Sequence, residues 1–231
     1  MIQISNLSKK YGETVVFSDL NYTFENACIY GLVGRNGAGK TTLLNILSNY
    51  DKNYTGVISI DRKKMNKVDY LDMPVAYAMD QPSFFNELTI YENLLLIASS
   101  RKIKKQEAFD KIERILDGLG LKTYENYSPL ELSKGTMQRL NNACAMIQEE
   151  KITIFDEPFS GLDPVQMKLL ENVIVEFHKK EKGIYIISSH DIECLQNVCD
   201  KCLLLHNGQI REINMEEVDR EEIAKILSEG E

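Results

Sequence analysis

The run from Ala27 to Asn49 restricts the fold of this chain more than any other stretch. It begins with ACIYGLV, continues with the glycine-rich turn GRNGAGKT, and ends in the helical pattern KTTLLNILSN. The turn fits G-x-x-x-x-G-K-[ST], whose glycines let backbone N–H groups close around phosphate oxygens at a helix N-terminus. The almost entirely apolar strand is typical of a parallel strand covered on both faces. The run therefore predicts an α/β core with a phosphate-binding loop.

The loop also predicts which part of a nucleotide each residue contacts. We expect Lys40 to reach the β- and γ-phosphates, Thr41 to hold Mg²⁺, and Thr42 to contact the α-phosphate. The predicted nucleotide-binding residues of the loop are Gly34, Asn36, Gly37, Gly39, Lys40, Thr41 and Thr42.

Two acidic residues end a second apolar strand, in ITIFDEP. We expect Asp156 to bind Mg²⁺ through water, and Glu157 to polarise the attacking water as a general base. Two solvated acids at a strand edge are the alternative, and the phosphate loop argues against it.

Two other polar residues also follow apolar strands. His190 comes after IYIISS, and because the carboxyl ends of parallel strands share one sheet edge, it can approach the same γ-phosphate. Gln81 follows VAYAMD. Taken alone, a histidine after a strand is more often structural, and Gln81 is a plain turn residue.

The order of patterns along the chain predicts the architecture around the loop. Strand patterns such as IQIS and TVVFSDLNYTF come first, residues from about 87 to 150 have helical periodicity, and strand–helix alternation then resumes. Asn207-Gly208 predicts a closing hairpin, and we expect the acidic C-terminal residues to form a frayed helix. We predict a single α/β domain over residues 1–231. It has a P-loop NTPase core with a mostly parallel sheet, an N-terminal antiparallel β subdomain, and a helical lobe (about 87–150) inserted in the core.

Composition argues against several other roles. A net charge of −8 disfavours a nucleic-acid-binding surface, because neutralising phosphates needs clustered Lys and Arg. No apolar run approaches the ~18–20 residues that span a bilayer, and the N-terminus lacks the organisation of a signal peptide. The 5 scattered cysteines are typical of a reducing compartment. We therefore expect a cytoplasmic chain.

A second helix start, LSKGTMQR, also has the features of a phosphate site. Ser133 is its predicted N-cap, Gly135 follows closely, and the helical run LNNACAMIQ comes next. One phosphate loop is enough to hold one nucleotide, so this second site needs a separate explanation.

Jointly, these motifs resemble the nucleotide-binding subunit of an ATP-binding cassette (ABC) transporter over nearly the whole chain. The resemblance rests on GRNGAGKTT, Gln81 in MDQPSFF, LSKGT, IFDEP, SGLD (Ser160 to Asp163) and His190, in the family's order. It implies that ATP and Mg²⁺ are bound and that Tyr11, in KKYGE, stacks on adenine. The implied catalytic residues are Glu157, His190 and Gln81. The implied Mg²⁺ ligands are Thr41, Gln81 and Asp156.

The resemblance also accounts for the second helix start. In this family two cassettes dimerise head to tail, and the signature motif of one covers the ATP held by the other. Ser133 and the backbone of Gly135 are then expected to face a partner's γ-phosphate, and Asp163 to lie across the interface and couple the two sites. The usual signature is LSGGQ, so Lys134 and Thr136 depart from it. Lys134 fits without a positive φ only if the helix begins early.

The expected function is that of an ATPase subunit driving separate transmembrane permease subunits from the inner face of the cell membrane. We expect a homodimer, with a second, different nucleotide-binding subunit as the alternative partner, and we expect no nucleic acid. A soluble ABC-type ATPase, for example in iron–sulfur cluster assembly, is the second hypothesis. A nucleotide-gated binding module without useful turnover is the third.

Overall fold

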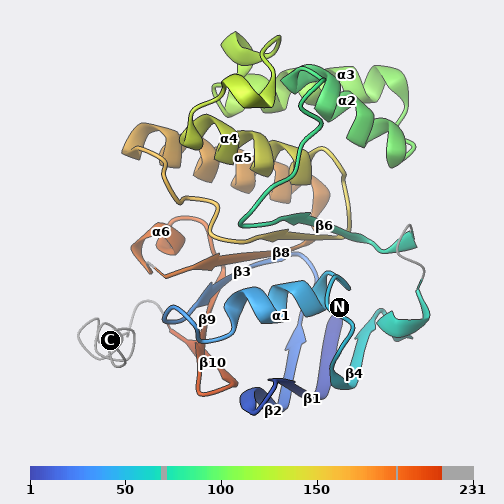
Figure 1. Cartoon of the computed structure of the whole chain (residues 1–231), viewed down its shortest axis with the longest axis vertical. Coiled ribbons are helices and arrows are strands. Elements are labelled where there is room, and N and C mark those ends of the chain that lie inside the picture. Colours follow the sequence, from blue (N-terminus) through green and yellow to red (C-terminus); the bar gives the residue numbers. More distant parts are fainter. Residues whose placement is uncertain (69–71, 191, 215–231) are drawn as a thin grey trace.

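The computed structural model describes residues 1–68, 72–190 and 192–214, and these form two sheets with helices between and above them (Figure 1). The first sheet has four strands in the order β2-β1-β4-β5. The second has six strands in the order β10-β9-β3-β8-β7-β6. The predicted helix in the acidic C-terminal residues lies outside the described residues.

The four-stranded sheet is the predicted antiparallel β subdomain. Its strands are β1 (Ile2–Tyr11), β2 (Thr14–Phe24), β4 (Thr55–Ile60) and β5 (Lys63–Lys64), and all its pairings are antiparallel. One face carries buried apolar side chains, because alternate residues of a strand point to the same face. These include Ile2, Ile4, Leu7, Phe17, Leu20, Phe24, Ile58 and Ile60.

The six-stranded sheet is the predicted mostly parallel core. It contains β3 (Cys28–Val33), β6 (Val75–Ala78), β7 (Ile152–Phe155), β8 (Ile184–Ser189), β9 (Lys201–His206) and β10 (Gln209–Ile213). Only β10 is antiparallel to its neighbour, which confirms the hairpin predicted at Asn207-Gly208. All residues of β3 are buried, as its apolar sequence predicted, since it lies between β8 and β9.

Helix α1 (Lys40–Leu47) lies between the two sheets (Figure 1). Its apolar side chains are buried in a cluster that includes residues of both sheets, so burial of apolar surface holds the sheets together through this helix. Its members from α1 are Leu43, Leu44, Ile46 and Leu47.

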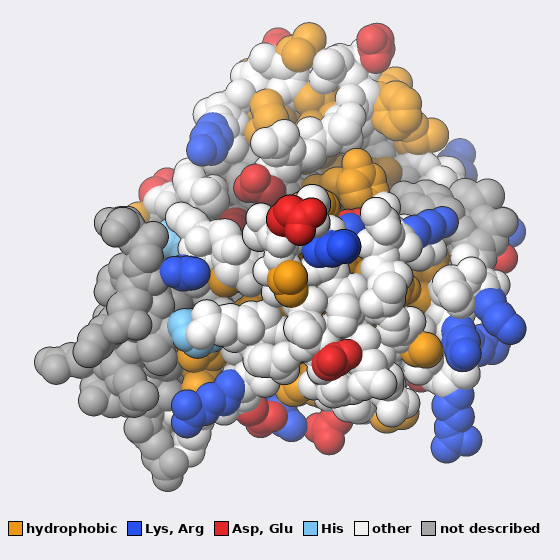
Figure 2. Space-filling view, turned by 60° about the horizontal axis from the view of Figure 1, so that its bottom comes forward, with side chains coloured by type: hydrophobic (Ala, Val, Ile, Leu, Met, Phe, Trp, Pro, Cys, Tyr) orange, Lys and Arg blue, Asp and Glu red, His pale blue; other side chains and the backbone are white. Residues whose placement is uncertain are grey.

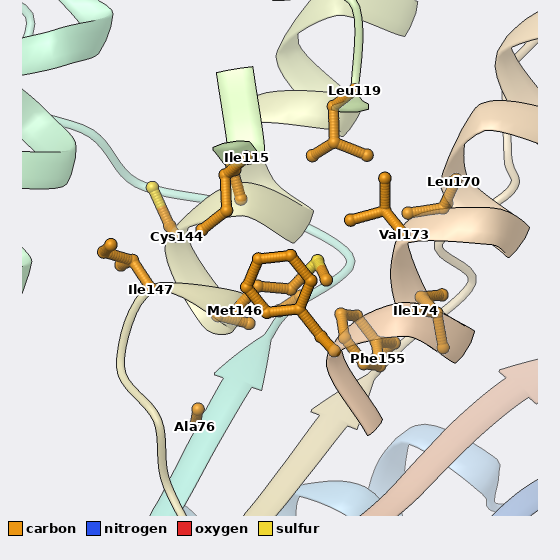
Figure 3. Packing of buried hydrophobic residues seen from close by; sticks show 14 of the residues in the cluster. Ala76, Ile115, Leu119, Cys144, Met146, Ile147, Phe155, Leu170, Val173 and Ile174 are labelled. Carbon is orange, nitrogen blue, oxygen red and sulfur yellow. The ribbon is translucent and has the colours of Figure 1, made fainter. Parts of the chain in front are cut away.

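The opposite face of the six-stranded sheet is covered by helices (Figure 1). They are α2 (Ile90–Ser100), α3 (Lys105–Gly118), α4 (Lys134–Met146) and α5 (Pro164–Glu181), and a short helix α6 (Glu193–Gln196) follows β8. Figure 3 shows the cluster in which Met146, Phe155 and Ile174 pack together. Residues about 87–150 are helical as predicted, and within them α4 also contacts β6 and β7.

The surface is mixed in charge. On the face shown in Figure 2, Lys and Arg side chains stand in several separate places, with acidic and apolar side chains between them.

The register of the parallel strands brings distant loops to one edge. Val33 at the end of β3 is paired with Ser189 on β8, and Phe155 at the end of β7 is paired with Ile187. The residues that follow these strand ends therefore meet at the carboxyl edge of the sheet.

Candidate active site

A cavity of about 520 Å³ lies at this edge, and many of the predicted site residues line it. The phosphate loop, the first turn of α1 and the loops after β7 and β8 form one part, and residues at the β1–β2 turn form the other. The lining residues are Tyr11, Thr14, Val16, Arg35, Asn36, Gly37, Gly39, Lys40, Thr41, Thr42, Asp80, Glu157, Ser160 and His190.

The loop needs its glycines. Gly37 and Gly39 have φ of 80° and 99°, in the left-handed region that residues with a Cβ rarely adopt. At Gly39 there is also no space, because a Cβ would come within 2.7 Å of Val16 Cγ1 and 3.1 Å of Phe17 Cζ. Gly39 is the N-cap of α1, so the backbone N–H groups of the helix start are available at the cavity.

Lys40 is held at the cavity by the loop itself. Its Nζ donates to the carbonyl oxygens of Gly34 at 2.7 Å and Arg35 at 3.4 Å, and it lies 3.6 Å from Glu157 Oε1. The side chain is only 7% exposed. A positive charge with so little freedom suits the binding of a phosphate, as predicted for this residue.

Asp156 is buried beside Glu157, at the end of β7. It accepts a hydrogen bond from Ser188 Oγ at 2.5 Å and one from Tyr77 OH at 3.4 Å, and it is hydrogen bonded to Thr41. Burial raises the pKa of Asp156 above its ordinary value, and the nearby carboxylates act in the same direction, whereas the hydrogen bonds from Ser188 and Thr41 lower it. A carboxylate and a hydroxyl in contact are hard oxygen donors of the kind Mg²⁺ prefers, so this pair fits the predicted metal.

Glu157 has an unusual backbone and a well-defined side chain. Its φ is 49°, which costs a residue with a Cβ about 1–2 kcal/mol. Its Oε2 lies 3.0 Å from His190 Nδ1, while its Oε1 faces Lys40. The structure thus brings the predicted base and the predicted histidine into direct contact, although they follow different strands.

Gln81 does not lie at the cavity with these residues. It is exposed and is not among the residues that line the cavity, whereas its neighbour Asp80 is. Its predicted roles as catalytic residue and Mg²⁺ ligand stay predictions from the resemblance. Tyr11, in contrast, does line the cavity, and its hydroxyl donates to Asp51 Oδ2 at 3.1 Å.

The signature residues lie outside the cavity of their own chain. Ser133 caps α4 by accepting a hydrogen bond from Thr136 N–H at 3.2 Å. The helix begins at Lys134, and Lys134 does not have a positive φ, so the condition for replacing glycine there is met. Thr136 is buried, and its hydroxyl contacts Ser133 Oγ at 2.8 Å.

The SGLD segment packs against the signature. A Cβ on Gly135 would come within 2.9 Å of the Gly161 carbonyl oxygen, so this glycine allows the two segments to approach closely. Asp163 is the N-cap of α5 and accepts from Gln166 N–H at 2.9 Å. Its role across a dimer interface stays a prediction.

Three residues for which no role was predicted also contact the two acids. Ser188 and Tyr77 contact Asp156, and Gln138 Nε2 donates to the Glu157 carbonyl oxygen at 3.2 Å. Ser188 stands two residues before His190 on a predicted strand, so the sheet register was the signal for it. Nothing in the sequence indicated Gln138, whose contact depends on how α4 lies on the sheet.

Comparison with known proteins agrees with the family resemblance that the motifs indicated. The family model for ABC transporters matches residues 17–160. The uncharacterized ABC transporter ATP-binding protein MJ1023 of Methanocaldococcus jannaschii is 32% identical over 90% of this chain and 75% of that protein. The tungstate uptake system ATP-binding protein TupC of Peptoclostridium acidaminophilum is 30% identical over 91% of this chain and 97% of that protein. A solved structure described as the ATP-binding subunit of an ABC transporter has a TM-score of 0.85 and 27% identity, covering 98% of this chain and 94% of that one.

Proposed function

Since the chain belongs to the ABC transporter family, we propose that it is the subunit that binds and hydrolyses ATP to drive a transporter. The observation that carries the proposal is the convergence of Lys40, Glu157 and His190 on one cavity, beside the Thr41–Asp156 pair. In this proposal residues 1–231 act as one ATP-binding domain with the helical lobe as an insertion.

The predicted site residues have the following roles in the proposed reaction. The loop backbone and Lys40 bind the phosphates, and Tyr11 stacks on the adenine. Glu157 accepts a proton from the attacking water, and the contact with His190 fixes the direction in which its carboxylate points. Thr41 and Asp156 would hold Mg²⁺, which supplies positive charge to the phosphate oxygens when it is bound. Gln81 is a proposed further ligand.

The signature completes the site of a second copy in this proposal. Ser133 and Gly135 are at the N-terminus of α4, where backbone N–H groups favour an anion, and they lie outside the cavity of their own chain. Two copies joined head to tail would place each signature over the other copy's ATP, with Asp163 at the contact between them. A homodimer is the simplest such pair, and a heterodimer is the alternative.

The membrane step belongs to other subunits in this proposal. Among the described residues, no helix is both long enough and apolar enough to cross a bilayer. We place the subunit at the inner face of the cell membrane, bound to separate permease subunits.

The decisive test is the molar mass of Glu157→Gln, measured by light scattering with and without ATP and Mg²⁺. We expect a monomer without nucleotide and a dimer with it, because the variant binds ATP but lacks the base. Its turnover should fall roughly 10²–10⁴-fold. Turnover at the wild-type rate would contradict the role of Glu157.

Lys40→Ala is the matched control, since it removes a phosphate contact instead of the base. It should weaken ATP binding itself, and unchanged affinity would contradict the assignment of the loop.

Purification from membranes with detergent then tests the partner. Recovery with an integral membrane protein supports a transporter, and recovery in a soluble complex supports a soluble ABC-type ATPase.

A further inference from the structure

The proposed reaction alone does not explain why the backbone of Glu157 has a left-handed conformation. With φ at 49°, it lies in the left-handed region, which glycine and asparagine adopt more readily than glutamate. The direction of the Cα–Cβ bond depends on this conformation. Contacts from elsewhere in the fold must therefore hold it.

Both peptide groups of Glu157 have such contacts. Its N–H donates to Ser188 Oγ on β8 at 2.9 Å. Its carbonyl oxygen accepts from Gln138 Nε2 on α4 at 3.2 Å and from Ser160 N–H at 3.1 Å. Ser188 is fully buried, and it donates its own proton to Asp156 Oδ1 at 2.5 Å. One hydroxyl thus fixes the positions of the two acids relative to each other.

The side chain of Glu157 depends on this backbone. Its two carboxylate oxygens lie 3.6 Å from Lys40 Nζ and 3.0 Å from His190 Nδ1. If the backbone relaxed to an ordinary negative φ, the Cα–Cβ bond would turn, and the carboxylate would leave both neighbours.

We propose that Ser188 and Gln138 are positioning residues for hydrolysis, which hold the left-handed backbone of Glu157 so that its carboxylate stays beside Lys40 and His190. The inference rests on the proposed function of this site. It also means that α4, whose first turn carries the signature, directly contacts the base of its own chain.

Gln138→Met is the most informative variant, because methionine has a similar length but no donor. We expect its kcat for ATP hydrolysis to fall by roughly 10-fold or more, since a small misplacement of a catalytic group has a large effect on rate. The affinity for ATP should stay within about twofold, because Gln138 contacts no phosphate-binding residue of the loop. Ser188→Ala should lower kcat similarly, and Ser188→Thr, which keeps the hydroxyl, should recover most of it.

A double-mutant cycle separates positioning from general damage. Combined with Glu157→Gln, Gln138→Met should cause little further loss, because the carboxylate that it positions is already gone. Asn141→Met is the matched control: Asn141 is also an amide on α4, but its Nδ2 donates to the Met79 carbonyl oxygen at 2.7 Å. Any effect of Asn141→Met should add to that of Glu157→Gln.

A kcat within about twofold of wild type for both Gln138→Met and Ser188→Ala would overturn the inference and leave the proposed function intact. Full additivity of Gln138→Met with Glu157→Gln would also overturn it. A wild-type chain that does not hydrolyse ATP would remove the proposed function and the inference together. Thermal unfolding checks that each variant is folded, and if Gln138→Met is not, the pair Ser188→Ala and Ser188→Thr decides.

Discussion

Asp51 accepts hydrogen bonds from three donors near the rim of the cavity. Lys9 Nζ lies 2.7 Å from its Oδ2, Tyr11 OH donates to the same oxygen at 3.1 Å, and Asn53 N–H donates to its Oδ1 at 2.9 Å. Burial raises the pKa of Asp51, but the three donors outweigh burial, so the pKa is lowered overall. Asp51 therefore stays ionised next to Lys9, whose side chain is only 2% exposed.

This contact predicts a pH-dependent contribution to stability. Because the pKa of Asp51 is lower in the folded state, its ionised form stabilises the fold above the unfolded pKa of about 3.9, and this stability is lost as pH falls through the folded pKa. At neutral pH, Asp51→Asn should lower the free energy of unfolding by about 1–3 kcal/mol. Urea unfolding of wild type and variant at neutral pH and near pH 3 measures the change.

The difference between Asp51→Asn and wild type should shrink at the acidic end. Glu13→Gln, at an exposed carboxylate on the nearby β1–β2 turn, is the control and should change stability by less than about 0.5 kcal/mol. A difference that stays constant with pH would show that Asp51 contributes through packing and not through its charge.

At the scale of residues, the sequence predicted the groups that follow strand ends. Lys40 was predicted from the phosphate-loop motif, and Asp156, Glu157 and His190 were predicted because a parallel sheet brings the carboxyl ends of its strands together. Contacts that depend on side-chain reach across elements were not predictable, such as that between Gln138 and the Glu157 backbone. Local patterns indicate which face of a helix is buried, but not which groups of a neighbouring loop that face contacts.

At the scale of elements, the N-terminus of helix α4 has both a structural and a proposed functional role. Its N-cap, Ser133, satisfies one of the free N–H groups of the first turn, and the same hydroxyl is proposed to meet a partner's phosphate. Ser133→Ala removes both functions. Ser133→Gly removes the hydroxyl but keeps most of the capping, since glycine is a good N-cap.

The two variants should therefore differ in stability and agree in dimerisation. Chemical unfolding should show a loss of about 1 kcal/mol for Ser133→Ala and only a few tenths for Ser133→Gly. In the Glu157→Gln background, both should lose the ATP-dependent increase in molar mass. If Ser133→Gly still dimerises with ATP, the hydroxyl is not the group that meets the phosphate.

The sequence predicted the types of the helices and strands well, and it predicted their first and last residues less well. Hydrophobic periodicity predicted the strands and the main helices, because each buries one face or is wholly buried. The alternation of strands and helices predicts a helix between β8 and β9, but α6 covers only Glu193–Gln196. The packing of α4 against both β6 and α2 depends on the tertiary fold, which periodicity does not specify.

At the scale of the whole molecule, an ion cluster around the buried ammonium group of Lys111 joins the helical lobe to the core. Lys111 on α3 is 1% exposed and pairs with Glu181 on α5 at 3.0 Å and with Glu149 before β7 at 2.7 Å. Tyr185 OH on β8 donates to Glu181 at 2.6 Å. Three parts of the chain thus meet at a single ammonium group.

Lys111→Met should lower the free energy of unfolding by about 3–5 kcal/mol, because it leaves a largely buried carboxylate without its partner. Lys122→Met is the matched control. Lys122 also pairs with two glutamates, Glu113 and Glu125, but its side chain is 42% exposed, so solvent screens these pairs and the loss should be much smaller than for Lys111→Met. Urea unfolding of both variants measures the comparison, and equal losses would show that burial of Lys111 is not what matters.

The position of β3 in the six-stranded sheet has a consequence for biosynthesis. This strand leads into the phosphate loop and is made early, but the strands that flank it begin only at Ile184 and Lys201. A growing chain on the ribosome therefore carries an apolar strand with two unpaired edges until most of its length has been synthesised. Such edges pair readily with other chains, so this is the stage at which chaperones would protect the nascent protein from aggregation.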